Sequence, residues 1–200
     1  MAFDIVKKNL EARGFSVKTF ATGEEAAEYL DRMIDGKSVG FGGSLTLQQI
    51  GLYEKLALHN QMYWHQVAAP EEKEAVRAAE LTAQIFCSSA NGLSEDGQIL
   101  NIDGIGNRVA ATLFGHEKVY FVIGRNKLCP TYEEALWRAR NIAAPKNAQR
   151  LGMKTPCAVK GDRCYDCKSP DRICRSLVVL WEPSVGMEVE VLLVDQDLGL

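Results

Sequence analysis

Seven short runs rich in β-branched and aromatic residues alternate with stretches of helical periodicity along the chain. The runs SVGFG (38–42) and KVYFVIG (118–124) are mostly apolar, as in strands that are buried on both faces of a parallel sheet. The other runs lie at 15–20, 84–89, 98–103, 176–181 and 188–194. This alternation predicts an α/β layered fold with a mainly parallel sheet.

Three of the intervening helices have recognisable starts. Thr22 and Thr131 each stand three residues before a glutamate, which is the pattern of a capping box. A third helical pattern, PEEKEAVRAAEL (70–81), has proline in its first turn. We expect Pro145 to end the helix that follows Thr131, because proline lacks the N–H that continues a helix.

Composition and charge narrow the class of protein. Hydrophobic residues make up 46% of the chain and charged residues 24%, which suits a soluble globular protein. The net charge of -3 argues against general nucleic-acid binding, which needs Lys and Arg to neutralise phosphates. The start, MAFDIVKKNLEARGF, reads as an amphipathic helix rather than a signal peptide, and no apolar run is long enough to span a membrane. We therefore expect a cytoplasmic protein without a membrane or nucleic-acid partner.

Four of the six cysteines lie in one short loop, PCAVKGDRCYDCKSPDRICR. Their spacing is C-x6-C-x2-C-x6-C, and the ligands it predicts are Cys157, Cys164, Cys167 and Cys174. In a reducing compartment such a cluster indicates a metal centre rather than disulfides or unliganded thiols. The spacing differs from the two close pairs of structural zinc sites and from that of bacterial ferredoxins. It is similar to the iron–sulfur loop of helix-hairpin-helix DNA glycosylases, which is one residue shorter in its last gap.

The charge around these cysteines supports a thiolate centre. Residues 146–175 carry eight Lys or Arg and three Asp, a net charge of +5 in an acidic protein. Four thiolates around Zn²⁺ or a [4Fe–4S]²⁺ core leave a charge of about -2, which nearby cations offset. We favour the [4Fe–4S] cluster and keep zinc as the alternative. We expect the two remaining cysteines, Cys87 and Cys129, to be buried apolar residues.

The segment ILNIDGIGNRVAATLFG (99–115) resembles a helix-hairpin-helix DNA-binding element at first sight. A DNA glycosylase is therefore one hypothesis, but three features count against it. Such glycosylases are almost wholly helical, the net charge here is acidic, and KVYFVIGRNKL occupies the place of the expected catalytic aspartate.

Three blocks of sequence carry a better resemblance: SSANGLSEDGQILNIDGIGNRVAATLFGHEKVYFVIGRNKL, RARNIAAPKNAQRL and VEVLLVDQDLGL. They are similar to the LUD-domain (lactate-utilisation protein, formerly DUF162) family over about residues 5–200, in its subgroup with a C-terminal four-cysteine loop. The resemblance implies a three-layer sandwich related to the CoA-transferase and sugar-phosphate isomerase fold group. Some members are small subunits of an iron–sulfur complex that oxidises L-lactate to pyruvate, so iron–sulfur partner subunits are implied.

Two glycine-containing turns are the candidate ligand site. SVGFGGSLTLQQIG places Gly42 and Gly43 where the backbone can approach a ligand, and Ser44 can cap the following helix. It is not a dinucleotide fingerprint, so no nicotinamide cofactor is supported. The alternative is a plain strand–turn–helix connection.

The second turn is IDGIGNR (102–108), which follows a hairpin turn predicted at SEDGQ (94–98). Asp103 can act as a base or accept from a hydroxyl, and Asn107 and Arg108 can hold a carboxylate or phosphate. Related isomerases place a similar Asp-Gly turn at their active site. The alternative is an Asx-stabilised turn with an Asp103–Arg108 ion pair. The candidate set from this turn and beyond it is Asp103, Gly104, Gly106, Asn107, Arg108 and Lys127.

From these patterns we expect an α/β core at 1–151, a metal-binding loop at 152–175 and two strands at 176–200 that return to the core. The favoured function is an accessory or electron-transfer subunit in the oxidation of a small hydroxy acid such as lactate, with a small anion bound at the two turns. The alternative is a small-anion or sugar-phosphate binding or sensor protein with a structural metal. The three histidines stand alone without ligand spacing, so we predict no role for them in a site. Apolar positions near 176–194 are compatible with a homodimer.

Overall fold

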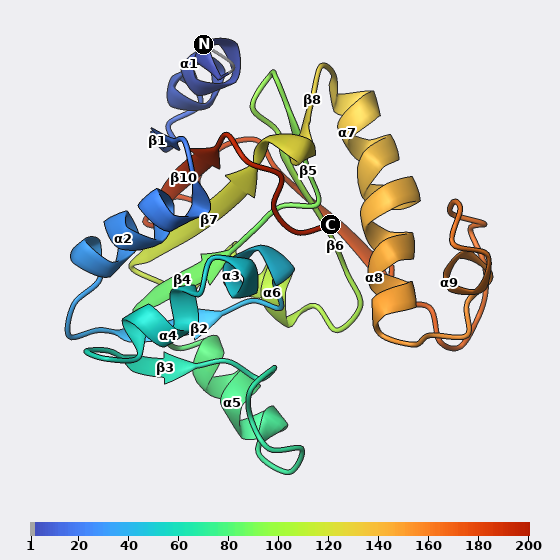
Figure 1. The fold of residues 1–200 in the computed structure, drawn as a ribbon, viewed down its shortest axis with the longest axis horizontal. Coiled ribbons are helices and arrows are strands. Elements are labelled where there is room, and N and C mark those ends of the chain that lie inside the picture. Colours follow the sequence, from blue (N-terminus) through green and yellow to red (C-terminus); the bar gives the residue numbers. More distant parts are fainter. Residues whose placement is uncertain (1–2) are drawn as a thin grey trace.

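The computed structural model describes residues 3–200. Within them, six parallel strands form the main sheet, in the order β1-β10-β7-β4-β2-β3 (Figure 1). The strands are β1 Ser16–Phe20, β10 Glu188–Val194, β7 Lys118–Gly124, β4 Ile85–Ser88, β2 Ser38–Phe41 and β3 Gln61–Tyr63. All of them except β3 were predicted from the sequence; β3 is too short to show a pattern.

The main sheet is covered on both faces, as expected for a parallel sheet. Alternate residues of β7 divide between two apolar clusters: Phe121 belongs to one and Val122 to the other. One face is packed by α2 (Gly23–Met33), α3 (Leu45–Gln49) and α4 (Leu52–Leu56). The other is packed by α1 (Asp4–Ala12), α6 (Asn107–Ala111) and a second sheet, and α5 (Lys73–Glu80) lies against β2 and β3. The layered α/β prediction is confirmed.

The second sheet has the order β8-β5-β6-β9 within the described residues. Its strands are β8 Leu128–Cys129, β5 Gly92–Ser94, β6 Ile99–Asp103 and β9 Ser176–Leu180. β5 and β6 form the hairpin predicted at residues 94–98, with Gly97 at φ 87° in the turn. Leu93, Ile99 and Leu180 pack in the same cluster as Phe121, so this sheet lies between the main sheet and α7 (Tyr132–Arg138), which packs on β5.

Pro145 does not end its helix, contrary to the prediction. Figure 1 shows one continuous rod from α7 through a π-helical turn, η2 (Ala139–Ala143), into α8 (Ala144–Arg150). A π turn widens the backbone just before the proline, so its ring avoids the carbonyl of the preceding turn. The helix predicted from Pro70 begins three residues late, at Lys73.

The predicted caps are confirmed. Thr22 accepts from the backbone N–H of Glu25 and Thr131 from that of Glu134. The helix-hairpin-helix reading is wrong, because residues 99–103 form strand β6 and are followed by the five-residue helix α6. No helix within residues 3–200 has the length and apolarity to cross a membrane.

The chain after the cysteine loop enters both sheets. β9 pairs with β6 in the second sheet, whereas β10 lies between β1 and β7 in the main sheet. Because β10 is an inner strand, it offers no exposed apolar edge. In 176–194 the large apolar side chains that are exposed are Leu177, Trp181 and Val185.

Candidate functional site

A cavity of about 640 Å³ lies at the carboxyl ends of the parallel strands. Ser44 follows β2, His65 follows β3, Ser89 follows β4 and Lys127 follows β7; all four line the cavity, as does Asp103 at the end of β6. Carboxyl ends of parallel strands share one edge of the sheet, which is where ligands bind in open α/β folds. The topology therefore gathers residues that are far apart in the sequence.

Seven of the nine predicted ligand residues line this cavity: Gly43, Ser44, Asp103, Gly104, Asn107, Arg108 and Lys127. The other two, Gly42 and Gly106, stand beside it. A Cβ on Gly42 would lie 2.8 Å from Cγ of Arg108, so this glycine allows the arginine stem to pack on the β2 turn. Gly106 has φ 96° and caps α6. Ligand contact by these nine residues stays a prediction.

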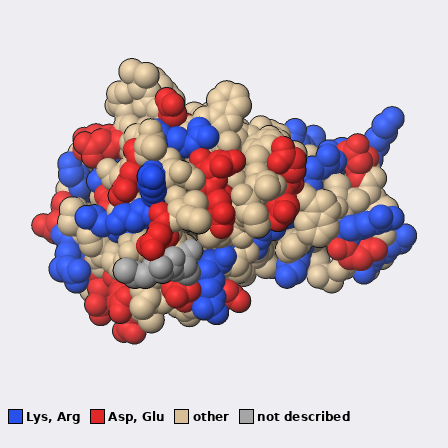
Figure 2. All heavy atoms as spheres, turned by 90° about the horizontal axis from the view of Figure 1, so that it is seen from above, with Lys and Arg blue, Asp and Glu red and all other residues tan. Residues whose placement is uncertain are grey.

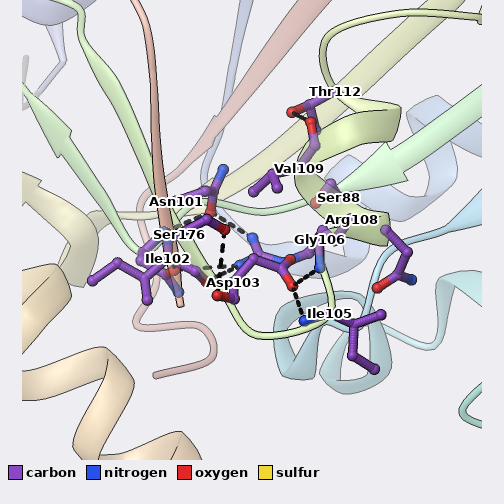
Figure 3. A network of polar contacts seen from close by, with 12 residues as sticks. Ser88, Asn101, Ile102, Asp103, Ile105, Gly106, Arg108, Val109, Thr112 and Ser176 are labelled. Atoms are coloured by element: carbon purple, nitrogen blue, oxygen red, sulfur yellow. Dashed lines mark hydrogen bonds and ion pairs between the residues drawn. The ribbon is translucent and has the colours of Figure 1, made fainter. Parts of the chain in front are cut away.

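Asp103 organises the turn between β6 and α6 (Figure 3). Its Oδ1 accepts from the backbone N–H groups of Ile105 at 3.0 Å and Gly106 at 2.8 Å. Its Oδ2 lies 3.4 Å from Nε of Arg108. This is the Asx turn with an ion pair that the sequence allowed as the alternative, and it rigidifies the floor of the cavity.

The Arg108 guanidinium is engaged by the protein itself. Nη1 donates to Oδ1 of Asn101 at 2.5 Å and approaches the carbonyl of Ser89, while Nη2 donates to the carbonyl of Ile102 at 2.7 Å. Burial lowers the pKa of Arg108 and the Asp103 charge opposes that shift. Arg108 thus ties β6, α6 and the end of β4 together at the cavity wall.

Lys127 is buried beside the same cavity. Its Nζ donates to Oγ1 of Thr46 at 2.7 Å and to Oγ of Ser89 at 2.8 Å. The C-terminal tail passes over it: a Cβ on Gly199 would overlap Oγ1 of Thr46 and lie 3.0 Å from Nζ. Gly199 also has φ 68°, so both space and conformation require glycine there.

His65 and Glu80 form a pair in the cavity wall that the sequence did not indicate. Nδ1 of His65 lies 2.6 Å from Oε1 of Glu80, which is buried at the end of α5. Glu80 also accepts from the backbone N–H of His65 and from the Asn107 amide. An isolated histidine and a glutamate fifteen residues later in a helix carry no local signal, so the sequence did not indicate that His65, which is partly buried, lines this cavity.

The charge of the cavity wall suits an anion. Lys73, Arg77 and Arg150 line it in addition to the buried basic residues Arg108 and Lys127, and Arg77 is paired with Glu74. Within residues 3–200, Asp103 is the only Asp or Glu among the lining residues, and it is paired with Arg108. The excess of cations favours a ligand that carries a carboxylate or phosphate.

The four predicted cysteine ligands line a second, small cavity between α8 and α9 (Pro156–Lys160). All six cysteines of the chain are free thiols. The side chains that share this cavity with them are Arg140, Ala144, Pro145, Ala148, Thr155, Arg172 and Ile173. Across residues 3–200, however, no three His, Cys, Asp or Glu side chains are placed to hold a single metal ion. The four sulfur atoms of the loop line the same small cavity, but they do not converge on a single coordination point.

Polar groups surround these sulfurs. The backbone N–H of Asp166 lies 3.4 Å from Sγ of Cys164, and Nη2 of Arg140 lies 4.0 Å from the same sulfur. Oγ1 of Thr155 lies 3.2 Å from Sγ of Cys157. Hydrogen-bond donors of this kind commonly surround the sulfurs of thiolate-held groups, so the donor set is compatible with one.

The end of the molecule that carries the cysteine loop is rich in Lys and Arg, with a few acidic residues among them (Figure 2). Arg172 donates from Nε to the carbonyl of Cys174 and from Nη1 to that of Cys167, which holds the two halves of the loop together. The remaining cysteines, Cys87 and Cys129, are buried, and burial raises the pKa of both thiols.

The two cavities adjoin. Ala144 and Ile173 line both of them. Gly104 of the Asp103 turn packs on the backbone of Ile173, where a Cβ would lie 2.7 Å from the Ile173 carbonyl oxygen. The backbone N–H of Arg175 donates to the carbonyl of Asp103 at 2.9 Å. The cysteine loop is therefore joined directly to the floor of the larger cavity.

Comparisons with known proteins agree with this architecture. The family model of the LUD domain matches residues 4–194. The crystal structure of a DUF162 family protein from Deinococcus radiodurans is similar, with a TM-score of 0.53 and 11% sequence identity, covering 96% of each chain. No curated protein matches the chain. Because the family model matches nearly the whole length of the chain, the chain belongs to the LUD domain family.

Proposed function

We propose that this protein is an accessory or electron-transfer subunit in the oxidation of a small hydroxy acid such as lactate. Membership of the LUD domain family supports a role related to lactate utilisation in general. The proposed role as an accessory or electron-transfer subunit rests on the two cavities. The larger one would hold the anionic acid, and Cys157, Cys164, Cys167 and Cys174 would hold a [4Fe–4S] cluster.

One observation carries this proposal: the ligand cavity and the cysteine cavity share Ala144 and Ile173 as walls. Redox chemistry needs its substrate and its electron carrier close together, and the chain joins the two sites through Gly104 and Ile173. When bound, a cluster would supply one-electron transfer at this position. Zinc on the same cysteines could only brace the loop.

The side chains of the larger cavity divide into two groups by position. Lys73 and Arg150 lie in its wall and would attract and orient a carboxylate, whereas Arg77 is already paired with Glu74. His65 would exchange a proton with the hydroxyl of the ligand. The carboxylate of Glu80 accepts the hydrogen of Nδ1, which leaves Nε2 as the basic nitrogen.

Metal and sulfide analysis of anaerobically purified protein tests the cluster. We expect brown protein with about four iron and four sulfide per chain. Cys164→Ala and Cys174→Ala should each lower the iron content strongly, whereas Cys129→Ala, a buried cysteine outside the loop, should leave it unchanged. Colourless protein with one zinc per chain would instead favour a small-anion binding or sensor protein with a structural metal.

Calorimetry tests the ligand cavity independently of the metal. Lactate, pyruvate and sugar phosphates are titrated into the parent protein and into Arg150→Ala and Lys73→Ala. We expect weaker binding in both variants, by roughly tenfold for each lost charge-assisted contact of about 1.4 kcal/mol. Lys18→Ala, on the exposed side of β1, is the control. Equal affinities in all four proteins would remove the cavity from the proposal.

A further inference from the structure

The amine of Lys127 lies beside the cavity and is shielded from bulk water. This is the usual environment of a reactive lysine. The residue is 3% exposed and lines the larger cavity at the carboxyl end of β7. The only hydrogen-bond partners of its Nζ within residues 3–200 are hydroxyls, those of Thr46 on α3 and Ser89 after β4. A lysine with a purely structural role in a protein interior is normally paired with a carboxylate.

The groups that face Lys127 do not favour its ammonium form. Two guanidinium groups, those of Arg108 on α6 and Arg138 on α7, lie near enough to repel it. The carboxylate of Asp103, which lines the same cavity, is paired with Arg108. Burial together with these two arginines lowers the pKa of Lys127 to about 7. A large fraction of the protein therefore holds a neutral amine at neutral pH.

The hydroxyl pair fixes how that neutral amine is bound. Oγ of Ser89 donates its own hydrogen to the carbonyl of Val122 at 2.6 Å, so its lone pairs are left to accept from Lys127. A neutral amine has two hydrogens, and Thr46 and Ser89 accept one each. Its lone pair is then uncommitted. An uncommitted lone pair on a desolvated amine is the requirement for nucleophilic lysine chemistry.

We propose that Lys127 forms an imine with a small carbonyl acid bound in the cavity. The amine lone pair forms a C–N bond to the carbonyl carbon, and the carbonyl π electrons move to its oxygen. The two amine hydrogens then leave with that oxygen as water, giving C=N with no change of oxidation state. The cations of the cavity wall, Arg150 and Lys73 among them, hold the carboxylate of the acid. This inference uses the cavity but depends neither on the cluster nor on hydroxy-acid oxidation.

Reductive trapping on the parent protein tests the inference. The protein is incubated with pyruvate as the probe, treated with cyanoborohydride, digested and mapped by mass spectrometry. We expect the reduced pyruvate adduct on Lys127, formed at neutral pH and half-maximal near the pH at which this amine loses its proton. Exposed lysines should become labelled only at higher pH, because an ordinary lysine amine is protonated at neutral pH.

Variants make the assignment specific. Lys127→Met should abolish trapping, and Lys18→Met should leave it unchanged. Thr46→Val with Ser89→Ala keeps the amine but removes its acceptors, and should slow trapping at least several-fold. An adduct that is absent from Lys127 in the parent protein, or no more abundant there than on exposed lysines at neutral pH, overturns the inference. The metal analysis described above is unaffected by either outcome.

Discussion

Nδ1 of His65 lies 2.6 Å from Oε1 of Glu80, and this contact joins the segment after β3 to the last turn of α5. Glu80 is 1% exposed. Its carboxylate is satisfied by the ring and backbone N–H groups of His65 and by the side chain of Asn107. Because a carboxylate can only accept, Nδ1 carries the hydrogen, and Nε2 is turned toward Gly43 at the cavity.

Removing this carboxylate should destabilise the protein. Glu80→Ala leaves three donors without a buried acceptor, so we expect a loss of about 1–3 kcal/mol in the free energy of unfolding. Glu80→Gln keeps one acceptor oxygen and should lose less. Urea denaturation measures both, with the exposed Glu74→Ala on the same helix as control. A Glu80→Ala protein as stable as the Glu74→Ala protein would contradict the buried network.

Arg108 should contribute strongly to the free energy of unfolding, in addition to its predicted contact with a ligand. Arg108→Met leaves the Asp103 carboxylate without its ion-pair partner and the oxygens of Asn101 and Ile102 without a donor. We expect a loss of about 3–5 kcal/mol, as for other broken buried pairs. Arg108→Lys should be intermediate, since an ammonium cannot reproduce the fork of donors. Chemical denaturation checks this against Arg32→Met, an exposed arginine on α2; a loss under about 1 kcal/mol for Arg108→Met would refute the prediction.

Gly104 should couple the two cavities. A Cβ at this position would stand 2.7 Å from the Ile173 carbonyl oxygen, so Gly104→Ala must push the cysteine loop away from the Asp103 turn. We expect faster proteolysis within residues 160–172 and, if the loop carries a cluster, a lower iron content. Ile105→Ala, at the exposed neighbour in the same turn, is the matched control. Equal proteolysis of the two variants would show that the loop tolerates the displacement.

The buried amine of Lys127 predicts how stability changes with pH. In the folded state the pKa is about 7, and in the unfolded state it is about 10.4. Between these values the unfolded chain binds one more proton at this residue, so the free energy of unfolding rises with pH by at most about 1.4 kcal/mol per unit. Lys127→Met should lack this slope. Parallel stability curves for the parent and the variant between pH 7 and 10 would contradict the lowered pKa.

The predictions from sequence were strongest where the pattern is local. Apolar runs identified β2 and β7, and threonine three residues before glutamate located the starts of α2 and α7. They failed where a long-range or geometric effect intervened. The π turn at Ala139–Ala143 lets Pro145 continue a helix, and the three-residue strand β3 exists because β2 is there to pair with it.

The candidate site shows the same difference between what local sequence patterns predict and what long-range contacts decide. Its glycine turns and cysteines could be named from the sequence because each lies within one short segment with a recognisable composition. Only the tertiary structure brought Lys127 to the hydroxyls of Thr46 and Ser89, or placed Ile173 between the two cavities, since these contacts join residues that are distant along the chain. The sequence by itself determined the layered fold, the capped helices and the grouping of four thiols, because local propensity and periodicity decide those. Which side chains face one another across the sheet edge, and which charges are buried there, was decided by the parallel strand order, which no local pattern encodes.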